Sequence, residues 1–426
     1  MKFNSKLLHA GYDSGADSQG SITPPIYRTT AYQFNNTEHA ANLFGLKEFG
    51  NIYSRLTNPT VGSLENRLTE LEDGAMCVAL SSGTAAVLYS LINISSQGDN
   101  FITDTQLYGG TFTMFSNILP EFGITFKKVD TTDLDLVEKS IDKNTRAIYV
   151  ETITNPGLVV ADIEGLSKVA HSKGIPLIVD ATFTTPALQK SIDFGADIVV
   201  HSLTKWMSGH GRVIAGAVIE KGGFEWGNGN FPLYDTPDTS YGGMRWGHDL
   251  GDLGSVAYSL RLRTVPLRNL GANMSPDTAF EVMSGLETLG LRIERHCENA
   301  KKAAKYLLDH DLVEWVRFPG LKDDPAYELS EKYLKGTGGT MVVFGIKGGK
   351  DSGQKFIDNL NMFRHVANVG DTRSLAIHPA TTTHSQLDDD ALIAAGSPPE
   401  LIRLSIGIED IEDILEDLSQ ALESTK

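Results

Sequence analysis

The sequence predicts an α/β protein built on a parallel sheet with helices on both faces. Between residues 61 and 220, short apolar runs alternate with stretches of helical periodicity, which is the pattern of repeated β-α-β units. These runs are apolar at nearly every position, as expected when both faces of a sheet are buried. Because 426 residues are too many for one core, we expect two closely packed domains.

Seven strands and three helices are expected in this first part. The strand runs are bounded by polar and turn residues, and they cover residues 75–80, 100–103, 124–129, 146–150, 176–179, 197–200 and 213–219. The helices are expected at residues 84–92, 112–120 and 162–171. Asp162 is a suitable N-cap for the last of them.

The remaining segments break this rhythm. Residues 1–60, rich in Gly, Ser, Thr, Asn and Pro, are expected to form an irregular arm that drapes over its own chain or a partner subunit. Residues 222–275 are expected to form an irregular insertion near the active site and the subunit contacts. Apolar residues recurring at three and four predict one long, bent helix over residues 278–308. The rest is expected to be α+β, with strands and helices at residues 341–346, 354–361, 401–405 and 411–422.

Composition indicates a globular protein without a nucleic-acid partner. The formal net charge of −17 disfavours binding to a phosphate backbone. The two cysteines, Cys77 and Cys297, have neither disulfide nor metal-ligand spacing, so we expect no metal site. Because no signal-peptide pattern and no apolar run of about 18 residues occurs, we expect a cytoplasmic protein that does not bind membranes.

A lysine and an aspartate follow the ends of two predicted strands. Lys205 comes after the run at 197–200, and Asp180 follows the run at 176–179. Open α/β sheets bind ligands at the carboxyl ends of their strands. This pair suits pyridoxal phosphate (PLP), because a lysine can form a Schiff base and a carboxylate can face the pyridinium nitrogen. A lone lysine could equally solvate a strand end, and it is the combination with Asp180 that favours the cofactor.

Three further turns carry side chains that suit a flat, phosphorylated ligand. Gly83 and Thr84 open a helix, where amides and the helix dipole attract anions, although the same turn could be a simple N-cap. Tyr108 could stack on a ring or pack within its loop. Asn155 could hydrogen-bond a ring substituent or stabilise the turn before Pro156.

Two arginines near the C-terminus could bind a carboxylate. Arg403 lies between apolar residues of a predicted strand, where an isolated guanidinium is costly unless it meets an anion. It could bind the carboxylate of an amino-acid substrate, or it could pair with Glu409 or Asp410 as part of the structure. Arg373 is the alternative clamp.

Taken together, these segments resemble the PLP-dependent Cys/Met-metabolism family, which includes cystathionine synthases and lyases, methionine γ-lyase and O-acylhomoserine sulfhydrylases. The resemblance runs nearly end to end. Its most specific pieces are Tyr-Ser-Arg-Leu-Thr-Asn-Pro-Thr at residues 53–60, Val-Asp at residues 179–180 and His-Ser-Leu-Thr-Lys at residues 201–205. It implies a fold-type I, aspartate aminotransferase-like architecture with a mostly parallel central sheet and a smaller α+β C-terminal domain.

The resemblance also implies three parts of the chain and an oligomer. Residues 1–60 would be an arm that reaches a neighbouring subunit, residues 61–275 the large PLP-binding domain, and residues 276–426 the small domain. A homo-oligomer with shared active sites is implied, as a homotetramer built from two dimers.

Each matched residue receives a role from the resemblance. Lys205 would hold PLP as a Schiff base, Asp180 would face the pyridinium nitrogen, and Tyr108 would stack on the ring and assist proton transfer. Other cofactor contacts, the last two of them lent by a neighbouring subunit, would come from Gly83, Thr84, Asn155, Ser202, Thr204, Tyr53 and Arg55. The substrate carboxylate would be bound by Arg403, Ser374, Asn155 and Tyr53.

Within this family, residues 107–111, 268–289 and 370–375 resemble the members that replace the acetyl group of O-acetyl-L-homoserine with sulfide, yielding L-homocysteine for methionine biosynthesis. Methionine γ-lyases usually carry a cysteine at the place of Gly110. γ-Elimination, a succinyl donor, and cysteine or methanethiol as acceptor all stay open. Trp206 departs from the family pattern and bears on substrate preference. A regulatory protein that binds PLP without turnover is disfavoured, because the residues that carry the chemistry are intact.

Overall fold

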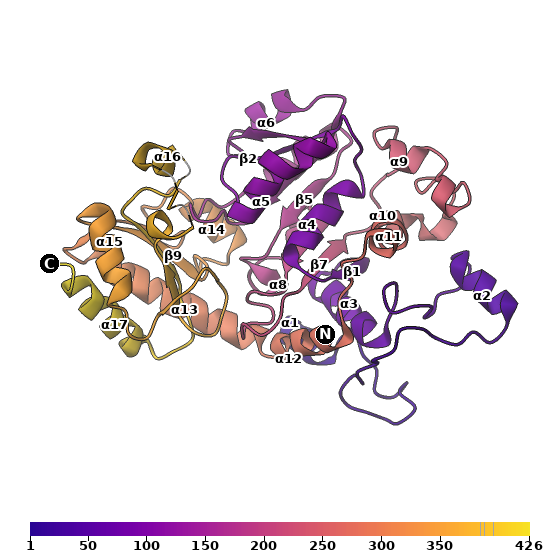
Figure 1. Ribbon diagram of the computed structural model, residues 1–426, viewed down its shortest axis with the longest axis horizontal. Helices are drawn as coiled ribbons and strands as arrows, with labels where there is room; N and C mark the ends of the chain where they lie inside the picture. The colour runs from indigo at the N-terminus through magenta and orange to yellow at the C-terminus, as the bar shows by residue number, and fades with distance from the viewer. Residues whose placement is uncertain (384, 387, 395) are drawn as a thin grey trace.

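Two β-sheets, each flanked by helices, organise the chain in the computed structural model (Figure 1), which describes all residues except 384, 387 and 395. The larger sheet has seven strands in the order β1-β7-β6-β5-β4-β2-β3. Its strands are β1 Met76–Leu80, β2 Asn100–Asp104, β3 Thr125–Val129, β4 Thr145–Glu151, β5 Leu177–Asp180, β6 Ile198–Ser202 and β7 Gly216–Glu220. Each predicted strand of this region is present within three residues of its expected bounds.

The larger sheet is mostly, not entirely, parallel. Strand β7 runs antiparallel to both of its neighbours, β6 and β1. Residues 203–208 form turns and residues 209–215 an irregular connection, with no crossover helix, and a parallel return would need such a crossover. This short connection keeps the residues that follow β6 at the edge where β6 ends.

Alternation along the strands sends side chains into two cores, one on each face of the larger sheet. Ile178 and Val200 belong to the core on the face of α4 (Gly83–Ile92), whereas Val179 and Val199 belong to the core on the face of α3 (Pro59–Glu72). All four of these valine and isoleucine side chains are buried. The remaining helices of this part are α5 Gly109–Thr113, α6 Leu134–Ser140, α7 Ile163–Ser172 and α8 Thr185–Leu188.

The predicted helix at 112–120 is longer than expected and changes type. A helical stretch runs from α5 through a π-helical turn, Met114–Ile118, and a 3-10 turn, Leu119–Phe122. The predicted N-cap of α7 is in place, but the Asp162 side chain makes no cap hydrogen bond. Its carboxylate instead accepts hydrogen bonds from the hydroxyl of Tyr333 and from Lys332, which joins the two parts of the chain.

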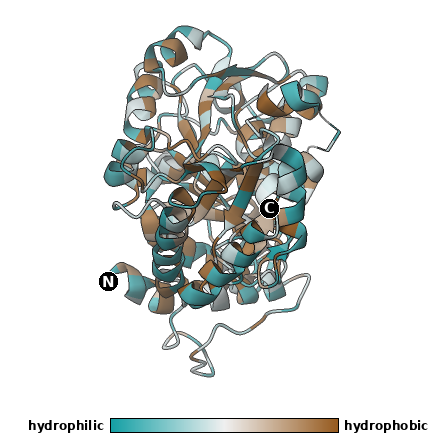
Figure 2. Ribbon diagram, turned by 90° about the vertical axis from the view of Figure 1, so that its left-hand side faces the viewer, coloured by the Kyte–Doolittle hydropathy of each residue, from teal (hydrophilic) through white to brown (hydrophobic). Residues whose placement is uncertain are grey.

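The smaller sheet has five strands in the order β10-β11-β12-β9-β8. They are β8 Val313–Arg317, β9 Met341–Ile346, β10 Arg364–His365, β11 Leu375–Ile377 and β12 Leu401–Ser405. The main helices around it are α13 Leu289–Leu308, α14 Tyr327–Tyr333, α15 Gly349–Asp358 and α17 Ile411–Glu423, and a short α16, Asp389–Ala394, follows residue 388. Figure 2 shows hydrophilic outer helix surfaces around apolar strands in this part.

The long helix predicted over 278–308 is two helices, α12 Pro276–Leu286 and α13. Arg292 of α13 donates a hydrogen bond to the carbonyl of Gly285, at 2.8 Å, so the guanidinium satisfies the end of α12. The same guanidinium donates to the carbonyl of Trp206 at 2.6 Å. Arg292 therefore connects the junction of α12 and α13 to the turn that directly follows Lys205.

The expectation of an irregular insertion at 222–275 is partly wrong. Residues 257–270 form a continuous helical stretch made of α10 (Ala257–Leu262), a π-helical turn that contains Pro266, and α11 (Arg268–Leu270). Trp226 stacks between Tyr234 and Tyr258, with ring centroids 5.0 and 5.1 Å apart. Trp226, Tyr234 and Tyr258 are thus part of a buried core. Because proline is unfavourable inside a helix, helix propensity alone does not predict a helix through Pro266.

The N-terminal arm is irregular only in part. Helix α1 (Phe3–His9) packs against α3 and α13, and its Leu7 is buried in the main core. Beyond it, residues 11–58 hold the short α2 (Thr37–Phe44), which extends away from the rest of the chain (Figure 1). Among the described residues, no helix combines the length and the apolar character needed to cross a membrane.

Candidate active site

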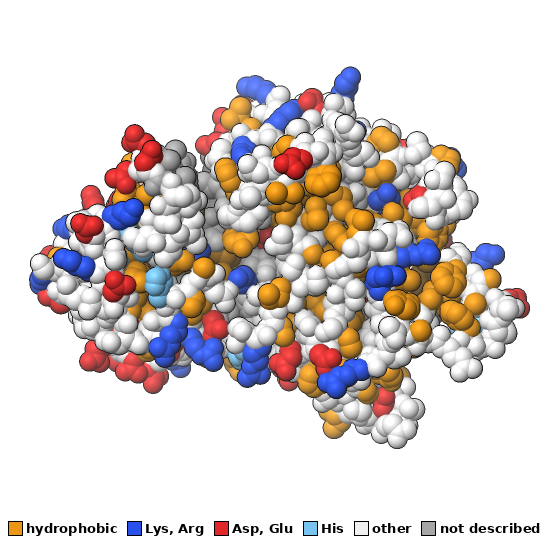
Figure 3. Space-filling view, in the orientation of Figure 1, with side chains coloured by type: hydrophobic (Ala, Val, Ile, Leu, Met, Phe, Trp, Pro, Cys, Tyr) orange, Lys and Arg blue, Asp and Glu red, His pale blue; other side chains and the backbone are white. Residues whose placement is uncertain are grey.

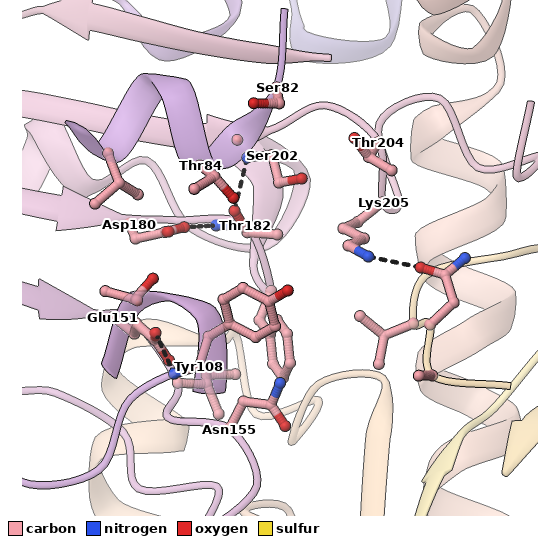
Figure 4. Close-up of a pocket in the computed structure, with 18 of the residues that line it drawn as sticks. Ser82, Thr84, Tyr108, Glu151, Asn155, Asp180, Thr182, Ser202, Thr204 and Lys205 are labelled. Atoms are coloured by element: carbon pink, nitrogen blue, oxygen red, sulfur yellow. Dashed lines mark hydrogen bonds between the residues drawn. The ribbon is translucent and has the colours of Figure 1, made fainter. Parts of the chain in front are cut away.

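A cavity of about 230 Å³ opens at the carboxyl ends of β4, β5 and β6, where the two parts of the chain meet. Figure 4 shows Lys205, Asp180 and Tyr108 around one space. The residues that line the cavity are Ser82, Gly83, Thr84, Val87, Tyr108, Thr111, Glu151, Ile153, Asn155, Asp180, Thr182, Phe183, Ser202, Thr204, Lys205, Ile214, Ala367, Asn368, Val369 and Arg403.

Lys205 stands three residues after the end of β6. Burial, and to a lesser extent the nearby Arg403, lowers the pKa of Lys205 to about 8. Its Nζ donates a hydrogen bond to Oδ1 of Asn368 at 2.6 Å. An amine with a pKa near neutrality is suited to act as nucleophile and as general base.

Two carboxyl groups lie side by side at the ends of β4 and β5. Glu151 and Asp180 are paired in the parallel register, so their side chains share one face of the sheet. Asp180 accepts hydrogen bonds from the backbone N–H of Thr182 at 3.0 Å and the hydroxyl of Tyr149 at 3.3 Å. Burial raises the pKa of Asp180 and raises that of Glu151 well above its usual range. In the described part of the chain neither forms an ion pair, so a cationic ring nitrogen is the partner that fits Asp180.

The turn from β1 into α4 lines one side of the cavity. The Ser82 hydroxyl accepts a hydrogen bond from the N–H of Ala85 at 3.0 Å, which caps α4 and leaves the amides of Gly83 and Thr84 at its first turn. A Cβ on Gly83 would lie 2.5 Å from the Cβ of Ser202, so glycine is required for the turn to meet β6. The start of α4 and the Ser202 hydroxyl together fit a phosphate group. The Thr204 hydroxyl donates to the carbonyl of Ala215 at 3.2 Å and accepts from the N–H of Ala215 at 3.0 Å, so it would have to turn from that carbonyl to join them.

Tyr108 is held by its backbone while its ring stays half exposed. Its N–H donates to Oε1 of Glu151 at 2.7 Å. A Cβ on Gly110 would lie 2.7 Å from Cε1 of the Tyr108 ring. A cysteine at 110 would therefore displace the ring from this position, and glycine permits it.

Arg403 is half-buried, and among the described residues it has no carboxylate partner. It donates to Oδ1 of Asn155 at 3.0 Å and to the carbonyl of Asn368 at 3.3 Å, and burial lowers its pKa to about 10. Among the described residues no acid forms an ion pair with it, so the alternative pairing with Glu409 or Asp410 is wrong. Arg373 is already paired with Asp371 at 2.9 Å, and its side chain is 63% exposed.

Three predicted site residues do not line the cavity of this chain. The Ser374 hydroxyl donates to Glu409 at 2.9 Å and accepts from the N–H of Gly407. These bonds occupy the hydroxyl, so it is not available to bind the substrate carboxylate. Tyr53 and Arg55 lie in the arm, with the Arg55 guanidinium 5.3 Å from the Tyr53 ring centroid. Residues 54–56 form a turn, so the segment that carries the pair is not extended.

Several lining residues were not assigned a role from the sequence. Glu151 carries the same signal as Asp180, a carboxylate at the end of an apolar strand, and that signal could have identified it. Asn368 lies in a loop with no periodic pattern, and its approach to Lys205 depends on the packing of the smaller sheet. Trp206, expected to bear on substrate preference, is fully buried and does not line the cavity.

The fold and the residues around the cavity define a PLP-dependent enzyme of fold type I. The sequence model of the family described as Cys/Met metabolism PLP-dependent enzymes matches residues 4–423. The chain therefore belongs to this family.

Individual relatives match over almost the whole chain. The chain is 45% identical to the O-acetyl-L-homoserine sulfhydrylase of Leptospira meyeri, covering 98% of this chain and 96% of that one. It is 45% identical to the homocysteine synthase of Schizosaccharomyces pombe, over 99% and 98% of the two chains. A crystal structure from Campylobacter jejuni, named for O-acetylhomoserine (thiol)-lyase, superposes with a TM-score of 0.94 at 41% identity over 99% and 100% of the chains. That protein carries N'-pyridoxyl-lysine-5'-monophosphate at its position 205.

Lys205 is expected to be the lysine that binds PLP covalently. Borohydride reduction of the yellow holoenzyme should fix the cofactor on Lys205, as peptide mapping by mass spectrometry would reveal. Lys205→Ala should bind PLP loosely and lose turnover by about 10²–10⁴-fold, since nucleophile and base vanish together. The exposed Lys139→Ala is the matched control. A reduced adduct on another lysine would disprove the assignment.

Proposed function

We propose that the protein catalyses a PLP-dependent γ-replacement that converts O-acetyl-L-homoserine and sulfide into L-homocysteine and acetate, a reaction of methionine biosynthesis. The observation that carries the proposal is the half-buried guanidinium of Arg403, which has no carboxylate partner among the described residues and lines the same cavity as Lys205. It offers a place for the carboxylate of an amino acid next to the reacting amine. The names of the full-length relatives support the choice of donor and acceptor.

The residues divide the work by position. Bound PLP would supply the electron sink that makes protons near the substrate amine acidic. Asp180 holds the ring nitrogen protonated, while the amides of Gly83 and Thr84 with the hydroxyls of Ser202 and Thr204 bind the phosphate. These four phosphate contacts lie at the ends of β1 and β6.

Substrate chemistry takes place between Arg403 and Lys205. Arg403, positioned by Asn155, binds the substrate carboxylate. Lys205 takes the proton from Cα, passes it to the bound cofactor and, again unprotonated, takes one from Cβ with the assistance of Tyr108; acetate then leaves from Cγ. Sulfide adds at Cγ, and the proton transfers run in reverse to release homocysteine.

The N-terminal arm supports an oligomer with shared active sites. Tyr53 and Arg55 do not reach the cavity of their own chain, and we assign them to the phosphate and substrate of a neighbouring chain. Figure 3 shows hydrophobic side chains gathered over the middle of the molecule and the arm. Exposed large hydrophobic side chains include Phe44 and Phe49 of the arm and Phe112 of α5. A second copy covering this face would complete each site, with two such dimers forming a cytoplasmic homotetramer.

The same proposal divides the chain at residues 60 and 275. Residues 1–60 serve the neighbouring site, 61–275 bind PLP, and 276–426 bring the substrate clamp. Arg403 and Asn368 belong to the last part, and Lys205 and Asp180 to the middle one. The reaction would thus take place where these two parts meet.

The function is tested by steady-state assay of purified holoenzyme on a grid of donors and thiols. O-acetyl-L-homoserine with sulfide is expected to give the highest kcat/KM, with acetate and homocysteine formed in equal amounts. The grid includes O-succinyl-L-homoserine, methionine, cysteine and methanethiol. A higher kcat/KM for γ-elimination from methionine, or for cysteine as acceptor, would replace the proposal with the lyase or cystathionine-forming activity.

The two candidate clamps are expected to differ strongly. Arg403→Ala should raise KM for the amino-acid donor roughly ten- to a hundredfold, because a desolvated contact between a guanidinium and a carboxylate is worth about 1.5–3 kcal/mol. Arg373→Ala, which breaks only a largely exposed ion pair, should change KM less than about threefold. Equal effects of the two substitutions would mean that the clamp lies elsewhere.

Shared sites are expected to be restored in mixed oligomers. Arg55→Ala and Lys205→Ala, each nearly inactive, should regain activity when unfolded together and refolded. A mixed dimer has one site with both lesions and one intact site, so random pairing limits recovery to about a quarter of wild-type activity. If native mass spectrometry verifies mixed dimers and no activity returns, Arg55 acts within its own chain.

A further inference from the structure

Asn368 lies between the two cationic groups of the cavity. Its Oδ1 accepts a hydrogen bond from Nζ of Lys205 at 2.6 Å, and its backbone carbonyl accepts one from Arg403 at 3.3 Å. It comes from the loop between β10 and β11, so it belongs to the smaller sheet, whereas Lys205 follows the larger one. One residue therefore connects the amine of one part with the guanidinium of the other.

The chemistry of this contact favours an amide over a carboxylate. The charged and titratable groups that line the cavity with Lys205 are Arg403, Tyr108, Asp180 and Glu151. In the described part of the chain neither carboxyl group lies within ion-pair distance of Nζ. A neutral oxygen can accept from the lysine in either protonation state, and it adds no negative charge that would compete with a substrate carboxylate for Arg403.

We propose that Asn368 is a positioning residue for Lys205, whose side-chain oxygen holds the lysine amine whenever that amine is not bonded to the cofactor. The inference rests on the proposed role of Lys205 as cofactor lysine and base. During turnover the substrate amine takes the place of Lys205, which is then a free amine on a flexible stem. The hydrogen bond to Asn368 restricts the positions of the Lys205 amine while it transfers protons to and from the substrate carbons.

The backbone carbonyl of Asn368 contacts Arg403 independently of the Asn368 side chain. Because Arg403 donates to the backbone carbonyl of Asn368, replacing the Asn368 side chain leaves that hydrogen bond intact. Substitution at 368 is therefore expected to separate the two functions, with an effect on proton transfer and little effect on carboxylate binding.

The first test measures Lys205 directly, without any amino-acid substrate. Apoprotein is mixed with PLP, and the rate of covalent binding is followed by absorbance between pH 6 and 10. Because only the unprotonated amine attacks the aldehyde, the rate rises with pH through the pKa of Lys205, which burial lowers to about 8. In Asn368→Asp the carboxylate should move this profile upward by about one to three pH units, since an opposite charge within contact distance favours the ammonium.

The second test uses holoenzyme with donor and sulfide. Asn368→Ala should lower kcat about tenfold, the size of one lost hydrogen bond, and leave KM for the donor within about threefold. The exposed Asn359→Asp and Asn359→Ala are the matched controls and should change neither profile. Circular dichroism and thermal unfolding establish that each variant is folded.

The outcomes separate this inference from the proposed function. A folded Asn368→Asp protein whose PLP-binding profile stays at the wild-type pH would overturn it. So would an Asn368→Ala protein whose KM rises as much as its kcat falls, since that result assigns Asn368 to the substrate. If the donor and thiol grid shows another activity while the Asn368→Asp profile still shifts, the inference stands and the proposed reaction falls.

Discussion

Two half-buried cations that share one cavity, with no carboxylate partner among the described residues, are the constraint on which the rest of the site depends. Lys205 and Arg403 line one cavity, and burial lowers the pKa of both. In the described chain their hydrogen bonds go to amide groups, those of Asn368 and Asn155. Such an arrangement is costly in an empty site and becomes favourable when an anionic substrate enters, because the anion repays the desolvation of the guanidinium.

Buried charges elsewhere hold the backbone that carries these groups. On the face of the large sheet away from the cavity, His201 of β6 bonds Glu72 at 2.5 Å, and both side chains are almost fully buried. Glu65 of α3 accepts from the N–H of Ala79 and from Arg263, each at 2.8 Å. These contacts connect α3 to β1, which precedes the turn with Gly83 and Thr84, and to β6, which precedes Lys205. Contacts on the far face of the sheet therefore help to fix the positions of Gly83, Thr84 and Lys205.

The small part of the chain is anchored in a similar way. Asp417 of α17 accepts three consecutive backbone N–H groups, those of residues 361–363, at 2.8, 2.9 and 3.0 Å. This fixes the start of the segment that leads through β10 to Asn368. The hydrogen bond from Arg292 to the carbonyl of Trp206 and the one from Tyr333 to Asp162 join the small part to the large one. The cavity thus lies at a junction held by specific polar contacts as well as by the two cores.

The sequence by itself determined the strands of the large sheet and the residues at their ends. Apolar runs bounded by polar residues are local signals, and a strand places its terminal residue at the sheet edge whatever the rest of the chain does. Lys205, Asp180 and Gly83 were identified in this way. The helix broken at residue 287, the aromatic core around Trp226 and the antiparallel β7 depend on contacts between distant segments, which local patterns do not encode. The tertiary structure alone decided that Arg403 lacks an acid, that Ser374 is committed to Glu409, and that Asn368 meets Lys205, because each is a contact between residues far apart in the chain.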